Sequence, residues 1–366
     1  MKATIITAAA ALALTACTGS EITMVVGTYT DGCTSLGLYS YRFDQDKGVL
    51  AAPGEEHYPE APGAVGRVEL RNPSYFTFSK DRHLIYAVSE LADSNASAST
   101  ISFDNKTGGM ELLNTELTGG MDPCYISTNG KCVLTANYTS GSVTELPLDK
   151  DGMLLGRDYL FMTQAGGPDT TRQNLPHAHC VLFNAAGTDV LISEFSADAV
   201  TRMDLATHET TRIQLPQDFG PRHIIMNHDE SRAYVIGELS GDIAVIDQAS
   251  DKVIQTICAD KSHARGSADI RLSPDGKFLY ASNRLQDDGI AIFQVNADGT
   301  LDYICYQCTG LHPRNFRITP NGKFLLVACR DSNVIQVFRR DKKDGLLYRT
   351  ASSIVLDKPV CIDFAR

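Results

Sequence analysis

Two stretches of this sequence are near copies of each other: SADIRLSPDGKFLYA at residues 267–281 and PRNFRITPNGKFLLVA at residues 313–328. Each has a short apolar run, an Asx-Gly turn and a second apolar run that is rich in aromatic and β-branched residues. This pattern is typical of a β-hairpin. Because it returns at a regular distance, it predicts a repeat architecture.

The same unit recurs along most of the chain, and a proline or a small residue marks each start. The starts are Pro73, Pro123, Pro176, Pro221, Ser267, Pro313 and Pro359. The spacing of 45 to 53 residues holds four short strands with their turns, which is the length of a propeller blade. A pair of β-sandwiches would also explain many short strands, but it requires no such period.

The last unit is incomplete, and the N-terminal segment supplies what it lacks. Residues 359–364 form one predicted strand before the chain stops, and residues 24–29 and 37–43 form strands with no first strand of their own. Pairing the two ends removes exposed sheet edges. We therefore predict an all-β fold: a seven-bladed β-propeller over residues 21–366, a single domain whose N- and C-terminal strands close a shared blade.

The composition is that of a folded, acidic protein. Among 366 residues, 43% are hydrophobic and 21% are charged, and the formal net charge is -11. Such a surface repels a phosphate backbone, so we expect no nucleic-acid partner. Nothing in these residues specifies an oligomeric state.

Residues 1–20 predict an export signal. Lys2 precedes an apolar run that is too short to span a bilayer, and the run ends in Leu-Thr-Ala-Cys at Cys17. This ending resembles a bacterial lipobox, which makes Cys17 the lipid-attachment residue; the alternative is an ordinary signal peptide with a chance cysteine. We expect export to the cell envelope of a bacterium, with the membrane reached only through that lipid.

Nine cysteines remain after Cys17, and an odd number cannot all pair with one another. Cys305 and Cys308 form a lone CxxC without a second pair at zinc-ribbon spacing. Unreactive thiols or an incidental disulfide are therefore the interpretation that we favour over a redox or metal role.

The repeat brings polar residues to one face, because the first strand of a blade begins where the antiparallel second strand ends. Any one of these charges could serve solubility alone, but together they predict a basic pocket for a small anion. The residues at these two positions are Ser74, Glu90, His177, His179, Arg222, His223, Glu238, Asp269, Arg284, Arg314, Asn315 and Arg330.

His177 and His179 raise the question of zinc, since side chains two residues apart share one face of a strand. No third ligand stands at a motif spacing, so we expect no metal. The sequence has no GxSxG, no GxxxxGK[ST] and no GxGxxG between a strand and a helix. Nucleophile-elbow hydrolysis and nucleotide cofactors therefore have no support, and no cofactor is expected.

Motifs along nearly the whole mature chain together resemble the seven-bladed lactonase family, which includes the propeller-type 6-phosphogluconolactonase and the carboxymuconate lactonising enzyme. The most specific of them are Gly-Pro-Arg-His at residues 220–223, followed by Glu-Leu at 238–239. The others are VGTYT at 26–30, NPSY at 72–75, ANY at 136–138 with SGSV at 140–143, PHAH at 176–179, ADI at 268–270, SNR at 282–284 and PRNF at 313–316.

The resemblance implies an enzyme that hydrolyses a sugar lactone, or a cycloisomerase that forms a lactone from an unsaturated dicarboxylate. A non-catalytic envelope propeller that binds an anionic glycan or a protein is the alternative of another class. By motif, the implied catalytic residues are His177, His179, Arg222, Glu238 and Arg284, and we add Arg314, Asn315, His223 and Glu90 as substrate-binding residues.

The expected roles follow from lactone chemistry. His177 or His179 would activate water, and Glu238 would assist by orientation or by sharing protons. Arg222, Arg284 and Arg314 would bind the oxyanion or a substrate anion. The sequence departs from the family pattern at Gly237 and at Ser193-Glu194-Phe195-Ser196. The export signal also separates this chain from a cytoplasmic phosphosugar, so a non-phosphorylated aldonolactone is a candidate substrate.

Overall fold

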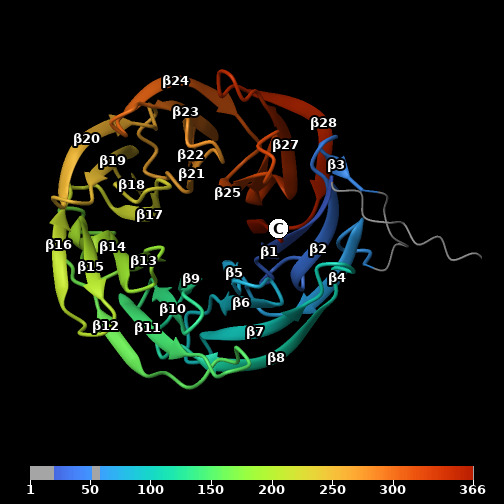
Figure 1. Cartoon of the computed structure of the whole chain (residues 1–366), viewed down its shortest axis with the longest axis horizontal. Coiled ribbons are helices and arrows are strands. Elements are labelled where there is room, and N and C mark those ends of the chain that lie inside the picture. Colours follow the sequence, from blue (N-terminus) through green and yellow to red (C-terminus); the bar gives the residue numbers. More distant parts are fainter. Residues whose placement is uncertain (1–19, 52–57, 366) are drawn as a thin grey trace, which may run out of the picture.

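The computed structural model describes residues 20–51 and 58–365, and this part of the chain is almost entirely β-strand. The strands form seven sheets that stand around a central axis (Figure 1). The prediction of a seven-bladed β-propeller is confirmed. The predicted signal up to Gly19, with Cys17, lies outside the described residues.

Six blades are continuous in sequence, and their strands run in order from the axis outward. Blade 1 has β5 (Phe76–Phe78), β6 (Leu84–Ser89), β7 (Ser97–Phe103) and β8 (Met110–Leu117). Blade 2 has β9 (Pro123–Thr128), β10 (Cys132–Asn137), β11 (Ser142–Pro147) and β12 (Tyr159–Met162). Blade 3 has β13 (Ala178–Phe183), β14 (Asp189–Glu194), β15 (Ala199–Asp204) and β16 (Thr210–Gln214).

Blades 4 to 6 repeat this arrangement. Blade 4 has β17 (Pro221–Met226), β18 (Arg232–Gly237), β19 (Asp242–Asp247) and β20 (Lys252–Cys258). Blade 5 has β21 (Ile270–Leu272), β22 (Phe278–Asn283), β23 (Gly289–Val295) and β24 (Leu301–Cys308). Blade 6 has β25 (Pro313–Ile318), β26 (Phe324–Cys329), β27 (Val334–Arg340) and β28 (Leu347–Val355). Two short 3-10 turns, η1 (Phe195–Ala197) and η2 (Arg330–Ser332), follow β14 and β26.

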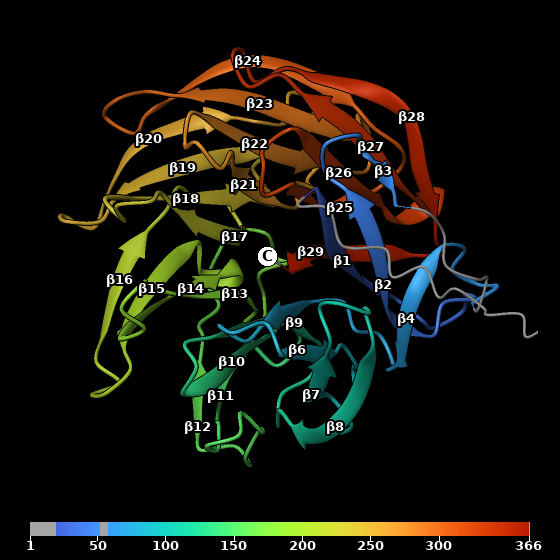
Figure 2. The ribbon, with the colours of Figure 1, turned by 45° about the vertical axis from the view of Figure 1, so that its right-hand side comes forward.

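The seventh blade is shared by the two ends of the chain, as predicted. The C-terminal strand β29 (Pro359–Ala365) is its innermost strand and pairs antiparallel with β1 (Glu21–Thr28). β2 (Gly37–Asp44) follows, and β3 (Val49–Leu50) and β4 (Ala64–Glu69) both pair with β2. Figure 2 shows β29 beside β1 near the centre of the ring.

The turn between the first two strands explains why the repeat is visible in the sequence. In blade 5, the Ser273 hydroxyl accepts a hydrogen bond from the Phe278 amide at 3.0 Å and contacts the Asp275 carboxylate. Gly276 follows with a φ of 69°, which glycine adopts without strain. Blade 6 builds the same turn around Thr319, so the Ser/Thr-Pro-Asx-Gly pattern is a requirement of the turn itself.

A tyrosine on the second strand ties one blade to the next. The Tyr86 hydroxyl donates to the Gly152 carbonyl of blade 2 at 2.9 Å, and Tyr234 donates to Gly299 of blade 5 at 2.9 Å. Tyr280 makes the same bond to Gly345 of blade 6 at 2.8 Å. In each case the acceptor lies in the turn before the outermost strand of the following blade. These bonds join blade 1 to blade 2, blade 4 to blade 5 and blade 5 to blade 6 in the same way.

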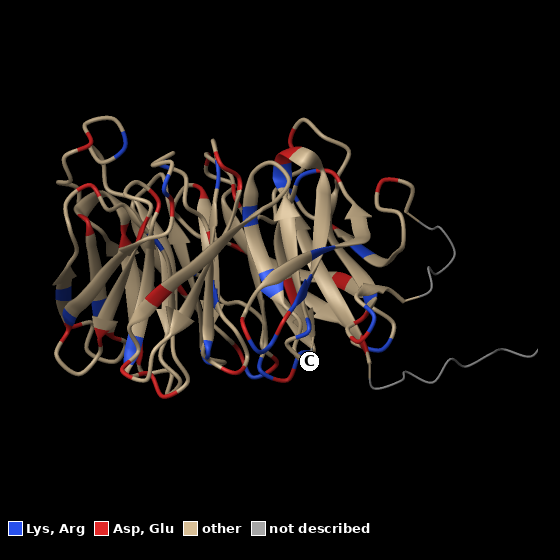
Figure 3. Ribbon diagram, turned by 90° about the horizontal axis from the view of Figure 1, so that it is seen from above, with Lys and Arg blue, Asp and Glu red and all other residues tan. Residues whose placement is uncertain are grey.

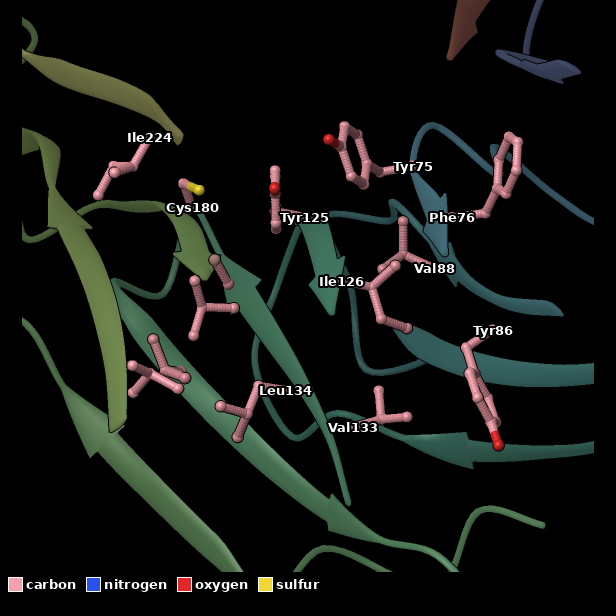
Figure 4. Packing of buried hydrophobic residues seen from close by; sticks show 14 of the residues in the cluster. Tyr75, Phe76, Tyr86, Val88, Tyr125, Ile126, Val133, Leu134, Cys180 and Ile224 are labelled. Atoms are coloured by element: carbon pink, nitrogen blue, oxygen red, sulfur yellow. The ribbon is translucent and has the colours of Figure 1, made fainter. Parts of the chain in front are cut away.

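The core lies between the faces of adjacent blades. Apolar side chains of β5 to β19 form one large buried cluster, part of which is drawn in Figure 4. Close to the axis, the Tyr75 and Tyr125 rings stack with centroids 4.2 Å apart. Charged residues lie mostly in the loops at the two faces of the ring, and the strands between them are largely uncharged (Figure 3).

The nine cysteines after Cys17 lie within the described residues, and all are free thiols in the structure, Cys305 and Cys308 among them. In the same residues, no group of three His, Cys, Asp or Glu side chains is arranged to hold a metal ion. Nor does any helix there have the length and apolar character needed to cross a membrane.

Candidate active site

A cavity of about 400 Å³ opens at one end of the central channel. We call the face of the ring that carries it the mouth face. The first strand of each blade begins at this face, and the second strand ends there. The cavity is lined by Tyr29, Glu90, Asp122, Cys124, Tyr138, Arg172, His179, Glu238, Arg284 and Arg314.

A recurring backbone bond explains which positions reach the cavity. The amide of the residue after the second strand donates to the carbonyl just before the first strand, as from Glu238 to Gly220 at 2.8 Å. Glu90 bonds Asn72 in the same way at 3.0 Å. This bond holds the residue after the second strand against the start of the first strand, and two rings of side chains therefore meet at the mouth.

The same bond shifts the start of one repeat. In blade 3, the Phe195 amide donates to the His177 carbonyl at 3.0 Å, so His177 corresponds to Gly220 and not to the first residue of the strand. Ala178 takes the place of Pro221, and His179 takes that of Arg222. Pro176 therefore stands two residues before the structural start, because the loop that precedes blade 3 is longer than its sequence pattern indicates.

Glu238 holds three guanidinium groups together. Its Oε2 accepts a hydrogen bond from Arg222 Nε at 2.8 Å and lies 3.2 Å from Arg284 Nη2. Its Oε1 accepts from Arg172 Nη2 at 2.8 Å. One carboxylate thus contacts three guanidinium cations, and this side of the cavity carries a net positive charge.

The charges around Glu238 fix its protonation state. Burial acts against the carboxylate, but Arg284, Arg222 and Arg172 lower the pKa of Glu238 to about 2. Burial and the neighbouring guanidinium groups lower the pKa of Arg284 to about 9, so it is still a cation at neutral pH. Glu238 is therefore ionised throughout the physiological range, and it orients the arginines.

Arg314 forms the opposite side of the cavity with Tyr29 and Glu90. Its guanidinium lies over the Tyr29 ring, 5.2 Å from the centroid, and its Nη2 is 3.7 Å from Glu90 Oε2. The Tyr29 hydroxyl donates to Glu90 Oε1 at 2.8 Å. Within the described residues, neither Glu90 Oε2 nor Arg314 has a hydrogen-bond partner, so both retain capacity for a ligand.

His179 lies between these two sides and is buried. Its Nδ1 is 3.7 Å from the Cys124 sulfur, and its ring meets the edge of Tyr138. Burial, followed by the positive charges of Arg222, His223 and Arg314, lowers the pKa of His179 well below its usual value. Burial raises the pKa of the Cys124 thiol. A neutral imidazole and a neutral thiol therefore face the cavity at pH 7.

The structure brings five of the nine predicted site residues into the cavity wall: His179, Glu238, Arg284, Arg314 and Glu90. Arg222 lies directly behind Glu238. His177 lies outside the lining, with its ring stacked on Tyr138 and its Nδ1 2.8 Å from the Tyr138 carbonyl. His223 and Asn315 are buried in the channel and both bond Asp269, at 2.8 and 2.7 Å.

Five lining residues were not among the predicted site residues: Tyr29, Asp122, Cys124, Tyr138 and Arg172. Four of them lie at repeat positions, either where a first strand begins or just after a second strand ends. The blade pattern could therefore have predicted these four. Arg172 lies in the long loop between β12 and β13, at no repeat position. Only the folded chain brings it to Glu238.

The cavity has the parts needed to open an ester-like carbonyl. A neutral imidazole can exchange a proton with water, and fixed guanidinium groups can stabilise an oxyanion or hold an anionic substituent.

Comparison with known proteins agrees with this fold and site. Residues 23–364 match the family model described as lactonase, 7-bladed β-propeller. The 6-phosphogluconolactonase of Bacillus subtilis is 31% identical over 354 residues, which covers 93% of this chain and 97% of that protein.

Two solved structures extend the likeness to three dimensions. A protein from Bacteroides uniformis is 47% identical with a TM-score of 0.89, and the match covers 94% of this chain and 100% of that one. The periplasmic gluconolactonase of Pseudomonas aeruginosa is 28% identical with a TM-score of 0.85, over 95% and 99% of the two chains. The protein described here therefore belongs to the family of seven-bladed β-propeller lactonases.

Proposed function

We propose that this chain hydrolyses a sugar lactone to the open hydroxy acid, in the cavity at its mouth face. Relatives that match nearly its whole length bear the names 6-phosphogluconolactonase and gluconolactonase. The observation that carries the proposal is the cavity itself, where a neutral histidine lies between Arg314 on one side and the arginines around Glu238 on the other.

The reaction needs only water and groups of this chain. Water attacks the carbonyl carbon of the lactone, and His179 accepts the proton that the water loses. The guanidinium of Arg314, with the charges around Glu238, stabilises the resulting oxyanion. The ring C–O bond then breaks, and the imidazolium returns the proton to the leaving oxygen.

The electrostatics favour the second half of this sequence. Burial, followed by the positive charge of Arg222, makes the protonated form of His179 a strong acid, so the proton passes readily to the departing alkoxide. As a base, the same imidazole is weak. A lactone carbonyl is reactive and the oxyanion is held by positive charge, so a weak base is sufficient.

The test compares the two histidines in a lactone hydrolysis assay on the purified mature protein. We expect His179→Gln and Arg314→Gln each to lower turnover of gluconolactone or 6-phosphogluconolactone by about 10²-fold or more. His177→Gln is the matched control, because its ring lies outside the cavity, and we expect a change of only a few-fold. Unchanged rates in both first variants would reject the assignment, and ligand binding without turnover by the wild type would favour a non-catalytic binding protein.

Export and lipid attachment at Cys17 complete the proposal, supported by the periplasmic relative. β1 is eight residues long, begins at Glu21 and ends next to Tyr29 in the cavity wall. The two ends of such a strand lie roughly 23 Å apart. The described chain therefore begins near the face of the ring opposite the mouth face. Labelling with a radioactive fatty acid, lost in Cys17→Ser, is the expected result; no labelling of the wild type would contradict it.

A further inference from the structure

The loop at residues 163–177 carries a single arginine into the cavity. Arg172 is the outermost of the three cations around Glu238: its side chain is 37% exposed, whereas those of Arg222 and Arg284 are 2% and 6% exposed. Its guanidinium carbon also lies 5.1 Å from the centre of the Phe195 ring. The loop therefore presents a partly exposed cation at the rim of a site whose other arginines are buried.

The donors of Arg172 are only partly used. Its Nη2 donates to Glu238 Oε1 and lies 3.3 Å from the Tyr138 hydroxyl. Its Nε and Nη1 have no acceptor in the described part of the chain. By contrast, the corresponding nitrogens of Arg284 already have partners: Nε donates to the Gly266 carbonyl and Nη1 to His312. Two nitrogens of Arg172, Nε and Nη1, can thus donate to an anion at the mouth.

Buried polar contacts hold this loop in place on the turn after β14. Gln173, next to Arg172, is almost fully buried. Its side-chain amide donates to Asp198 Oδ1 at 2.6 Å and to the Phe195 carbonyl at 3.0 Å. Asp198 in turn accepts from the Gly220 amide at 2.9 Å, which fixes the start of β17. The loop is therefore held at the segment Glu194-Phe195-Ser196, where the sequence departs from the family pattern.

A second contact holds the outer part of the loop. Arg265 Nη2 donates to Asp169 Oδ2 at 2.6 Å, and the same guanidinium bonds both carboxylate oxygens of Asp218, at 2.6 and 2.8 Å. Arg265 thereby joins the loop to the segment before blade 4. The guanidinium of Arg172 is held at a fixed place, and a fixed donor loses little entropy when it binds.

We propose that Arg172 is a specificity-determining residue that favours lactones with an anionic substituent, phosphate or carboxylate, and that Gln173 is a positioning residue that acts through it. The net positive charge around Glu238 and the two free donors of Arg172 carry this inference. It rests on the proposed lactone hydrolysis, and it adds which class of lactone the rim selects. The lactone ring lies at His179 and Arg314, and its charged substituent at the rim.

The experiment measures selectivity on matched pairs of lactones. The charged and neutral pairs are 6-phosphogluconolactone with gluconolactone, and glucaro-1,4-lactone with glucono-1,4-lactone; they distinguish a phosphate from a carboxylate. We expect Arg172→Gln to lower kcat/KM for the charged member by about 10- to 100-fold, mostly through KM, and for the neutral member by less than about threefold. Arg172→Lys should recover part of the preference, because it restores the charge but not the forked geometry.

Gln173→Leu tests the positioning role. It removes the amide that bonds Asp198 while it leaves Arg172 in the sequence, and we expect the charged-to-neutral ratio to fall by about three- to tenfold. Simple destabilisation lowers the rates for the charged and the neutral lactone equally, so the ratio of the two rates does not depend on the folded fraction. Arg71→Gln is the control: this arginine pairs with Asp31 in a loop at the mouth face, outside the cavity, and the ratio should not change.

Binding measurements separate this inference from the proposed function. Calorimetry with 6-phosphogluconate and gluconate measures the contribution of Arg172 without turnover. If the wild type hydrolyses no lactone, the proposed function fails, but weaker binding of 6-phosphogluconate alone in Arg172→Gln would still support the role of Arg172. If Arg172→Gln leaves the charged-to-neutral ratio unchanged, both in kcat/KM and in binding, the proposed role of Arg172 is overturned.

Discussion

At the scale of single residues, the site depends on buried charges that neutralise one another. Glu238 compensates three guanidinium groups, and Asp269 is shared by His223, Arg271 and Asn315. A buried ion that loses its only partner is costly, so such groups tolerate few substitutions. The same charges that hold the arginines in place also set the protonation state of the histidines.

His223 makes this coupling measurable. Its Nδ1 lies 2.8 Å from Asp269 Oδ1, and its Nε2 lies 3.3 Å from Arg222 Nη1. A carboxylate only accepts and a guanidinium only donates, so the imidazole must be neutral, with its proton on Nδ1. Burial, followed by the charge of Arg222, lowers the pKa of His223 to about 3.

We predict that the free energy of unfolding falls as the pH drops from about 6.5 towards 3. In that window the unfolded chain binds a proton at His223 that the folded protein cannot bind, so acid favours unfolding. His223→Gln should remove up to about 1.4 kcal/mol per pH unit from this slope. Urea unfolding at several pH values measures it. The exposed His83→Gln should leave the slope as it is, and an equal slope in both variants would contradict the prediction.

At the scale of elements, each blade is held to its neighbour by contacts that the repeat specifies. The Tyr234 hydroxyl reaches from β18 of blade 4 to the Gly299 carbonyl before β24 of blade 5. Gly299 has a φ of 84°, and a Cβ there would lie 2.5 Å from Arg232. The tyrosine and the glycine of the next blade are therefore required together, although 65 residues separate them.

We predict that Tyr234→Phe lowers the free energy of unfolding by about 1–3 kcal/mol, because it leaves the buried Gly299 carbonyl without its donor. Denaturant unfolding followed by circular dichroism measures the change. Tyr348→Phe is the control, since the Tyr348 side chain is 43% exposed on β28. A loss of similar size in the control would show that the bond between blades contributes nothing of its own.

At the scale of the whole molecule, the ring depends on the pairing of its two ends. β29 lies between β1 and the axis, with Val26 opposite Ile362. The Ile362 amide donates to Asn315 Oδ1 at 2.8 Å, and its carbonyl accepts from Arg317 Nε at 3.0 Å. The last strand therefore closes the shared blade and also joins it to blade 6.

Deletion of residues 359–366 should prevent stable folding. It exposes the edge of β1 and the apolar side chains that β29 covers, which promotes aggregation. Size-exclusion chromatography and circular dichroism of the truncated protein measure the loss. A circular permutant with the two ends joined and new termini in the turn between β19 and β20 keeps every strand pair, and it should fold. A monomeric, folded truncation would contradict the closure argument.

The sequence predicted the number of blades, their order and the shared closing blade, because a turn such as Ser273-Pro274-Asp275-Gly276 is a local requirement that repeats. It also predicted His179, Glu238, Arg284, Arg314 and Glu90 at the mouth. In every blade, the first strand begins and the second strand ends at the same face of the ring, so the side chains at these positions gather there.

The tertiary structure alone decided the rest. It placed His179 and not His177 in the cavity, since a backbone bond between Phe195 and His177 sets the register of blade 3. It also brought Arg172 to Glu238 through a loop of no repeating pattern, held by Gln173 and Asp198. Repeated local turns are encoded by neighbouring residues. Arg172 and Glu238, in contrast, are 66 residues apart, and they meet only because the loop before blade 3 packs against blade 4.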